Sequence, residues 1–441
     1  MEIDKTTLND LNIFNGENNL SLFGKINFTN TTNGEDQLKL FLSTPLKSID
    51  EIKNVQDTIR YIIPIINSWP SEISNGTIKV IERFYDSNLN AIPERVSFYH
   101  AKLFSFLQKS DYSLLKFSVN HCFDFIKGLK SIVHLLSNSE TPLILKNVLA
   151  DIEKSIQKKS LEIIDKTENA NQLNVQQIIQ LGYFFRNQFK SSMLDLLKIH
   201  AKIDAWFGMA KSVHEHQLTF PVFVETERPF FNAKGLHHLI LNNPTPYDFN
   251  LDQQKHFLFL TGANMAGKST FIKSVGSAVF LAHTGMAVPA QNMELSFFDG
   301  MLSNINIMDD LSKGESYFYN EVQRIKSSIH KINDGRKWLI LIDELFKGTN
   351  VEDAMKCSTI VIEGLVKIPN VLCILSTHLY EISESLKKHN NIKFNYFETS
   401  FIDDQFQFSY ALKEGVSNDR LGYLILKKEG VIQMLEDLTN K

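Results

Sequence analysis

A glycine-rich turn between an apolar strand and a helix carries the residue types that bind a polyphosphate. Residues 257–270 read FLFLTGANMAGKST and fit the phosphate-loop pattern G-x-x-x-x-G-K-[ST]. The glycines let successive backbone N–H groups point inward, and the start of the helix adds its positive dipole end. Lys268 supplies a charge to the outer phosphates, and the Ser269 hydroxyl supplies a ligand to magnesium. We therefore predict a nucleotide-binding loop made of Gly262, Ala263, Asn264, Met265, Ala266, Gly267, Lys268, Ser269 and Thr270.

Two later strands end in groups suited to nucleotide hydrolysis. Residues 338–344, WLILIDE, form an apolar run ending in two carboxylates, which is typical of a strand buried on both faces of a parallel sheet. Coupled to the phosphate loop, Asp343 is predicted to hold magnesium through water and Glu344 to polarise the attacking water. The next apolar run, VLCILS at 371–376, precedes His378. A histidine at a strand end is commonly structural, but its place one strand beyond the acidic pair favours contact with a γ-phosphate.

The polar segment 309–318, DDLSKGESYF, opens another predicted helix. A capped helix start accounts for it, with Ser312 and Ser316 as candidate caps. A helix start with serine and glycine can also bind a phosphate, including one held by a second copy of the protein. Thr349-Asn350, just past the acidic strand, can similarly lie at a subunit interface.

The first half of the chain carries none of these motifs and has helical periodicity. Pro45 separates two predicted helices, Pro142 opens a third, and residues 176–216 read as one or two long helices. We interpret their apolar stripes as helix-on-helix core. After His216, apolar runs rich in Pro, Phe and Val alternate with turn residues. These patterns predict a helical domain over 1–216 and an α/β nucleotide-binding domain over 217–441.

Composition sets limits on the class of protein. The length of 441 residues allows two to three domains, and a net charge of −4 gives no global basic field for nucleic acid, although a local patch can still bind it. No apolar run approaches the roughly 18 residues that cross a bilayer, and the polar N-terminus is not a signal peptide. Cys122, Cys357 and Cys373 lack CxxC spacing, which indicates free thiols. We therefore predict a cytoplasmic protein without a membrane partner. His237-His238 has no ligand partner at metal spacing and reads as a core or surface pair.

Together these residues resemble the MutS family of DNA mismatch repair ATPases. The similarity in the second half lies in GANMAGKST at 262–270, the turn at 288–290, DDLSKGESYF at 309–318, LIDELFKGTN at 341–350 and STH at 376–378. EGVSNDRLGYLIL at 414–426 is similar to the family's closing helices. In the first half, LNDLNIF, SLFGKINFTNTTNG and LSTPLKSIDEIKNVQD are similar to the start of its helical core.

The resemblance implies a fold, cofactors and roles. The expected fold is an α/β P-loop ATPase domain of the ATP-binding-cassette type with C-terminal dimerisation helices, preceded by an all-α lever or core domain. ATP and Mg²⁺ are the expected cofactors, and a homodimer through the ATPase domain with DNA as a further partner is the expected assembly. The implied roles are phosphate binding by Asn264, Lys268 and Ser269, magnesium binding by Asp343, water activation by Glu344, γ-phosphate sensing by His378 and reach to the opposite subunit's nucleotide by Ser316. Tyr247 or Phe249 is a candidate for stacking on adenine, and core packing accounts equally well for either.

The sequence departs from the family at several positions. Alanine stands at Ala263 and Ala266, where the family has proline and glycine, so the loop is expected to avoid a left-handed turn at both. Phe346-Lys347 replaces the family's Gly-Arg, which is expected to alter coupling between paired sites. The chain starts at the helical core, so mismatch-reading and connector domains are expected to be missing and the distal DNA clamp trimmed or absent. We interpret Phe223-Val224-Glu225 as a strand and not as a wedge between bases.

Two functions of different classes follow. The first is an ATP-hydrolysing dimeric switch that contacts DNA through helical levers without reading mismatches by itself. The second is a scaffold or partner-binding protein that uses ATP as a conformational switch and does not bind DNA. A transporter-type or chromosome-structure ATPase fits less well, because no long heptad arms flank the motifs and DDLSKGESYF differs from their signature.

Overall fold

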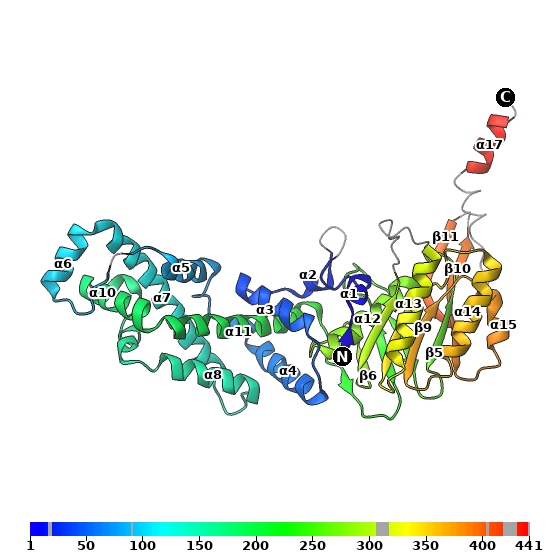
Figure 1. Ribbon diagram of the computed structural model, residues 1–441, viewed down its shortest axis with the longest axis horizontal. Helices are drawn as coiled ribbons and strands as arrows, with labels where there is room; N and C mark the ends of the chain where they lie inside the picture. Colours follow the sequence, from blue (N-terminus) through cyan, green and yellow to red (C-terminus); the bar gives the residue numbers. More distant parts are fainter. Residues whose placement is uncertain (16–19, 90, 306–316, 403–404, 418–429, 440–441) are drawn as a thin grey trace. The chain divides into compact units, whose positions relative to one another are not determined.

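A computed structural model describes residues 1–15, 20–89, 91–305, 317–402, 405–417 and 430–439. The chain forms two compact units (Figure 1). The sheet unit comprises Met1–Lys25, Pro45–Ile52 and His216–Lys441, and the helical unit comprises Ile26–Thr44 and Lys53–Glu215. In the described part of the chain, no helix combines the length and the apolar character needed to cross a membrane.

The structure corrects the prediction of a continuous helical domain over 1–216. Met1–Lys25 belongs to the sheet unit because its first residues extend the large sheet. Strand β1 (Glu2–Ile3) pairs in parallel with β7 (Gly300–Asn304), and helix α1 (Lys5–Asp10) follows it. The Asp10 carboxylate accepts the Ser303 hydroxyl and, at 3.1 Å, the N–H of Ile305. A strand of two residues is too short to show periodicity in the sequence, so the sequence pattern did not predict it.

The helical unit is built around α7 (Lys109–Leu136), most of whose apolar residues are buried against its neighbours, while Leu114 and Phe117 are exposed. The predicted helices on both sides of Pro45 are present, and Pro142 directly precedes α8. The segment predicted as one or two long helices forms two helices, α10 and α11, joined by a π-helical turn. This local widening interrupts the α-helical hydrogen-bond register between them. The helices lying wholly or mainly in this unit are α3 (Thr32–Ser43), α4 (Ile49–Ile62), η2 (Ile63–Ser68), α5 (Asn75–Asp86), α6 (Phe98–Leu107), α7 (Lys109–Leu136), α8 (Leu143–Ile156), η3 (Lys159–Leu161), α9 (Glu162–Asp165), η4 (Ala170–Gln172), α10 (Val175–Tyr183), η5 (Phe184–Gln188) and α11 (Lys190–His216).

A buried carboxylate fixes the start of α3. Asp204 of α11 is 2% exposed and accepts hydrogen bonds from the N–H groups of Asn30 and Thr31 and from the Thr31 hydroxyl, at 3.0, 2.9 and 2.6 Å. A negative charge at a helix N-terminus is stabilised by the helix dipole and by the unpaired N–H groups. The approach is so close that a Cβ at Gly34 would lie 2.1 Å from Asp204 Oδ2, which explains the glycine in TTNG.

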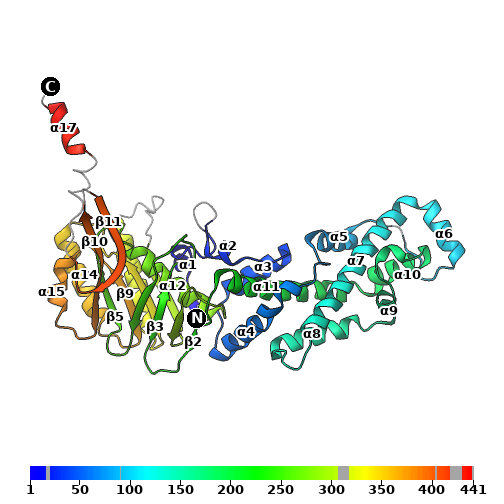
Figure 2. The same ribbon diagram turned by 180° about the vertical axis from the view of Figure 1, so that it is seen from behind.

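The sheet unit contains two sheets (Figures 1 and 2). Among the described residues the larger sheet has the strand order β1-β7-β8-β9-β5-β10-β11, parallel except for the β10–β11 pair, and the smaller has the order β2-β6-β3-β4. Because β8, β9 and β5 are adjacent and parallel, the residues after their carboxyl ends share one edge. The strands are β1 (Glu2–Ile3), β2 (Val222–Phe223), β3 (Phe231–Leu236), β4 (Tyr247–Leu251), β5 (Phe257–Thr261), β6 (Asn292–Leu295), β7 (Gly300–Asn304), β8 (Trp338–Asp343), β9 (Val371–Ser376), β10 (Ile392–Ile402) and β11 (Gln405–Glu414).

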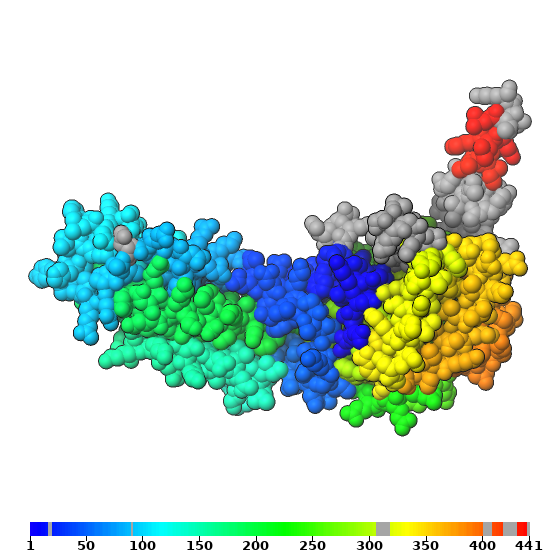
Figure 3. Space-filling view, in the orientation of Figure 1, coloured from blue at the N-terminus to red at the C-terminus, as the bar shows by residue number. Residues whose placement is uncertain are grey.

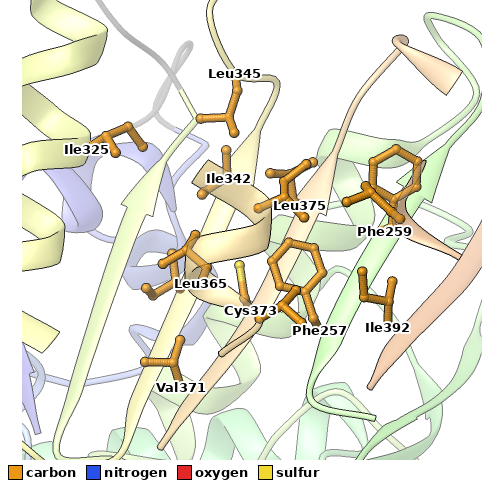
Figure 4. Packing of buried hydrophobic residues seen from close by; sticks show 14 of the residues in the cluster. Phe257, Phe259, Ile325, Ile342, Leu345, Leu365, Val371, Cys373, Leu375 and Ile392 are labelled. Carbon is orange, nitrogen blue, oxygen red and sulfur yellow. The ribbon is translucent and has the colours of Figure 1, made fainter. Parts of the chain in front are cut away.

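Helices cover both faces of the large sheet. One face packs against α12, where a Cβ at Gly276 would lie within 2.7 Å of Leu341 and Leu11. The other face forms a core cluster with α13 and α14, in which Ile325, Ile342 and Leu365 are among the buried side chains (Figure 4). In the space-filling view α13 and α14, coloured yellow to gold, cover this side of the unit (Figure 3). The helices of the unit are α1 (Lys5–Asp10), α2 (Leu22–Ile26), α12 (Lys268–His283), α13 (Tyr317–Ile332), α14 (Val351–Leu365), η6 (Tyr380–Ile382), α15 (Ser383–Leu386) and α17 (Val431–Thr439).

An ion pair ties α1 to α13 and predicts a pH-dependent stability. Asp4 caps α1 and pairs with Arg324 at 2.7 Å and Lys331 at 3.6 Å. Burial alone would raise the pKa of Asp4, but hydrogen bonds from Arg324 and Thr7 outweigh it and bring the pKa from 3.8 to about 2. The carboxylate therefore stabilises the fold above about pH 4, and this contribution is lost as the pH falls toward 2.

We expect Asp4→Asn to lower the free energy of unfolding by about 2 kcal/mol at pH 7, because asparagine keeps the cap and removes only the charge. Urea denaturation followed by circular dichroism measures the effect, and the gap from the parent protein should narrow at pH 3. Asp57→Asn is the matched control, since Asp57 forms an exposed pair with Arg60 and should change stability by less than about 1 kcal/mol. A gap that stayed constant between pH 7 and pH 3 would contradict the assignment.

Candidate nucleotide-binding site

The phosphate loop leaves the buried strand β5 and enters α12 through left-handed residues. Gly262 and Gly267 have φ values of 138° and 108°, and Met265, 77% exposed at the loop tip, has a φ of 69°. Neither Ala263 nor Ala266 takes a positive φ, which confirms that the loop avoids a left-handed turn at both alanines. Glycine supplies the two most demanding positions without a steric penalty.

Lys268 is folded back onto the loop. Its Nζ donates to the carbonyl oxygens of Gly262 at 2.7 Å and Ala263 at 2.9 Å. Burial lowers the pKa of Lys268 to about 8, against the opposing effect of the Asp343 carboxylate. The ammonium therefore lies inside the loop with its charge incompletely neutralised, which makes it a strong donor for an incoming anion.

Asp343 joins the phosphate loop to the two neighbouring strands. One carboxylate oxygen accepts the hydroxyl of Ser269 on α12, and the other accepts the hydroxyl of Ser376 at the end of β9. The predicted magnesium ligands Ser269 and Asp343 are therefore in direct contact. In the described residues no group of three or more His, Cys, Asp or Glu side chains could hold a metal. A hydroxyl and one carboxylate fit Mg²⁺, which keeps several waters and takes further oxygens from substrate phosphates.

Glu344 has an unusual backbone and two partners. Its φ is 72°, a left-handed value that non-glycine residues rarely adopt. One carboxylate oxygen lies 3.1 Å from Lys347 Nζ, and the other contacts Nδ1 of His378. Burial and the Lys268 charge lower the pKa of His378. The sequence predicted Glu344 and His378 as separate catalytic groups, and the structure places them in contact.

Glu344 and Lys347, but not His378, line a cavity of about 630 Å³. It brings together the predicted residues Asn264, Met265, Gly267, Lys268, Ser269, Thr270, Asp343, Glu344 and Tyr247. Residues that the sequence reading did not assign also line it: Leu241, Asn243, Pro244, Thr245, Lys347, Thr377 and Tyr410. The turn before β4 gave the only sequence signal for the first four, since NNPTP is rich in turn residues.

The two aromatic candidates for stacking on a base lie in the core. Phe249 is 4% exposed, packs edge-on against Phe271 and lies outside the lining of the cavity. Tyr247 is 5% exposed and packs edge-on against Phe271 and Phe397, so only a small part of it reaches the cavity. Tyr410 of β11 is 41% exposed on the cavity wall and stacks on Phe408 with ring centroids 6.0 Å apart. A ring that is 41% exposed at the cavity is better placed to receive a base than the rings of Tyr247 and Phe249, which are 5% and 4% exposed.

We expect Tyr410→Ala to weaken ATP binding about 5- to 150-fold, because base–aromatic stacking contributes about 1–3 kcal/mol. Isothermal titration calorimetry measures the change. Tyr410→Phe should bind ATP like the parent. Inorganic triphosphate has no base, so it should bind Tyr410→Ala and the parent protein equally. Equal weakening for ATP and triphosphate would show that Tyr410 shapes the loop and does not stack.

Some predicted residues lie outside the described part of the chain. Ser316 and Ser312 are among them, together with the rest of 306–316, and so is most of the 414–426 segment. Of the segment DDLSKGESYF, the described residues are Tyr317 and Phe318, which begin α13. Of the predicted strand 223–225, Phe223 ends the short strand β2, and Val224 and Glu225 lie beyond it. His238 is buried beside His237.

The second half of the chain is similar to a known family domain. Residues 258–437 match the family MutS domain V. The chain is 30% identical over 249 residues to the DNA mismatch repair protein MutS of Thermotoga maritima, which covers 55% of this chain and 30% of the relative. It is 26% identical over 240 residues to the protein of the same name from Petrotoga mobilis (54% and 29%), and 30% identical over 201 residues to that from Aquifex pyrophilus (45% and 23%). The matches span less than a third of each relative. The second half of the chain, which holds the phosphate loop and the acidic strand, is thus similar to domain V of MutS proteins.

Proposed function

We propose that the sheet unit is an ATPase of the ATP-binding-cassette type that hydrolyses ATP to ADP and phosphate. One observation carries this proposal: Lys268 and Ser269 of α12, Asp343 of β8 and Glu344 directly after it line a single cavity at the carboxyl edge of a parallel sheet. This edge is where α/β sheets bind ligands. The relatives' name and the family match support the same conclusion.

Each residue has a proposed role. Lys268 exchanges its two loop carbonyls for phosphate oxygens, and the loop N–H groups from Asn264 to Thr270 cradle the phosphates. Ser269 and Asp343 would hold Mg²⁺, which would neutralise charge that develops on the phosphates. Glu344 orients the attacking water and accepts its proton. His378, in contact with Glu344, reports the γ-phosphate by exchanging that contact. Tyr410 stacks on the base.

We further propose that two copies close on ATP as a homodimer, in which Ser316 completes the opposite copy's site. Charge-assisted hydrogen bonds contribute about 1.5–3 kcal/mol each to a closed form. A few of them supply the roughly 5.5 kcal/mol that moves a two-state equilibrium from 1:99 to 99:1. Hydrolysis removes these bonds and reopens the dimer. We also propose that the helical unit contacts DNA, on the strength of the relatives' name alone. We propose further that the protein is cytoplasmic.

The experiment that tests this function measures ATP hydrolysis by the purified chain with and without duplex, mismatched and branched DNA. We expect magnesium-dependent turnover, and DNA affinity that falls steeply between 50 and 200 mM salt, because phosphate contacts release counterions. Turnover without DNA binding at low salt would favour the ATP-switched scaffold. Absence of turnover under all conditions would reject the ATPase.

Shared sites are tested by mixing two inactive variants. Ser316→Ala and Lys268→Ala each spoil both sites of a homodimer, but a mixed dimer has one intact site. With random exchange half of the dimers are mixed, so we expect recovery of about a quarter of the parent activity for a two-fold symmetric assembly. No recovery after verified subunit exchange would contradict the shared arrangement.

A further inference from the structure

A buried carboxylate behind the cavity takes no part in the proposed chemistry. Glu321 of α13 is 0% exposed, yet it lies beside the loop that follows the acidic strand. Its two carboxylate oxygens accept the backbone N–H groups of Lys347 at 3.1 Å and Gly348 at 3.2 Å. Burial raises the pKa of Glu321, and these backbone donors oppose the rise. A buried carboxylate is costly unless hydrogen bonds satisfy it, and the hydrogen bonds of Glu321 fix the backbone of this loop.

The loop that Glu321 holds has a strained backbone. Glu344 and Phe346 have φ values of 72° and 59°, both left-handed and neither a glycine. Such conformations persist only where the surroundings enforce them, and they gather at functional sites. Phe346 is enforced from α13 as well, because its ring is 5% exposed and packs on Phe318 with centroids 5.7 Å apart. Helix α13 therefore fixes this loop twice, once through an aromatic contact and once through Glu321.

The anchored loop reaches the predicted water-activating group directly. Lys347, whose N–H is bound by Glu321, places its Nζ 3.1 Å from Oε2 of Glu344. The other oxygen of Glu344 contacts His378. The direction of the Glu344 carboxylate is thus set by two neighbours, and the position of one of them depends on Glu321.

We propose that Glu321 is a positioning residue that orients Glu344 for hydrolysis by anchoring the backbone of Lys347 and Gly348. The inference rests on the proposed ATPase function and deepens it. Glu321 itself lies outside the cavity lining and holds the backbone of one lining residue, Lys347, so we expect its removal to lower the rate of the chemical step far more than the affinity for nucleotide.

The test compares Glu321→Gln with Asp299→Asn. Both changes replace a carboxylate that accepts a backbone N–H in the sheet unit, but Asp299 holds Lys337 before the start of β8, at the opposite edge of the sheet. We expect Glu321→Gln to lower kcat at least 10-fold and to change the Kd for ATP with Mg²⁺ less than 2-fold. Asp299→Asn should change neither. Thermal melting of both variants identifies a temperature at which each is folded.

A double-mutant cycle separates positioning from general destabilisation. If Glu321 acts through Lys347, the double variant Glu321→Gln with Lys347→Ala should lose little more activity than the worse single variant, whereas independent effects would multiply. Multiplied effects, an unchanged kcat, or a parallel rise in Kd would overturn the inference. If Glu321→Gln does not fold, Lys347→Gln, an exposed side chain, tests the same link: kcat should fall at constant Kd, and an unchanged kcat rejects it. A parent protein without any turnover rejects the ATPase itself, which is a different result from an active parent with an active Glu321→Gln.

Discussion

Glu344→Gln should bind ATP normally and hydrolyse it about 100- to 10,000-fold more slowly, because a positioned general base contributes a factor of this size. The glutamine amide keeps the shape of the side chain but cannot accept a proton from water. It also loses the charge that attracts Lys347 at 3.1 Å, so the lysine is free to turn toward the cavity. With turnover blocked, the ATP-bound state should accumulate as a stable dimer.

Steady-state phosphate release and size-exclusion chromatography with light scattering measure the two effects. Glu384→Gln is the matched control, since this exposed acid pairs with Lys387 on α15 and lies outside the cavity lining. The control should hydrolyse ATP at the parent rate and return to the parent's oligomeric state. Normal hydrolysis by Glu344→Gln would remove Glu344 from its proposed role.

Lys268→Met should weaken binding of ATP with Mg²⁺ by about 150- to 25,000-fold. The ammonium now donates to two loop carbonyls at 2.7 and 2.9 Å, and phosphate oxygens would replace them as partners. Two charge-assisted bonds at about 1.5–3 kcal/mol each give about 3–6 kcal/mol. Methionine fills the same space without a charge, so the loss reflects the ammonium.

Calorimetric titration measures this affinity, with Lys255→Met, an exposed lysine before β5, as the control. Retained affinity in Lys268→Met would show that the backbone of the loop alone holds the nucleotide.

The sequence predicted those parts of the site whose residues are close together along the chain. The phosphate loop, the acidic pair after β8 and the histidine after β9 each follow an apolar run that is a buried strand. That these residues lie close together in the fold was also predictable, because the carboxyl ends of parallel strands lie at the same edge of the sheet. The roles of these residues stay predictions.

Tyr410 shows what local patterns cannot supply. The run QFQFSYALKE is an alternating strand with no chemical motif, and only its pairing with β10, itself beside β5, brings Tyr410 to the loop. The position of Glu321 could not be predicted for a similar reason. On a helix it reads as one polar residue among several, and its burial depends on where the loop after β8 lies. The sequence marked Phe346 as a departure from the family's glycine, but its left-handed backbone was not predicted, because such a backbone contradicts the local preference of phenylalanine and is decided by tertiary packing.

The short strand at the very beginning of the chain has a practical consequence for isolating the second half of the chain. Cutting at residue 217 would remove β1, α1 and the Asp4 and Asp10 carboxylates from the sheet unit. The freed edge of β7 would then present unpaired N–H and C=O groups, a template on which other chains can aggregate. Expression of 217–441 alone should therefore yield insoluble protein, and solubility should return when a peptide covering residues 1–15 is fused back or supplied in trans.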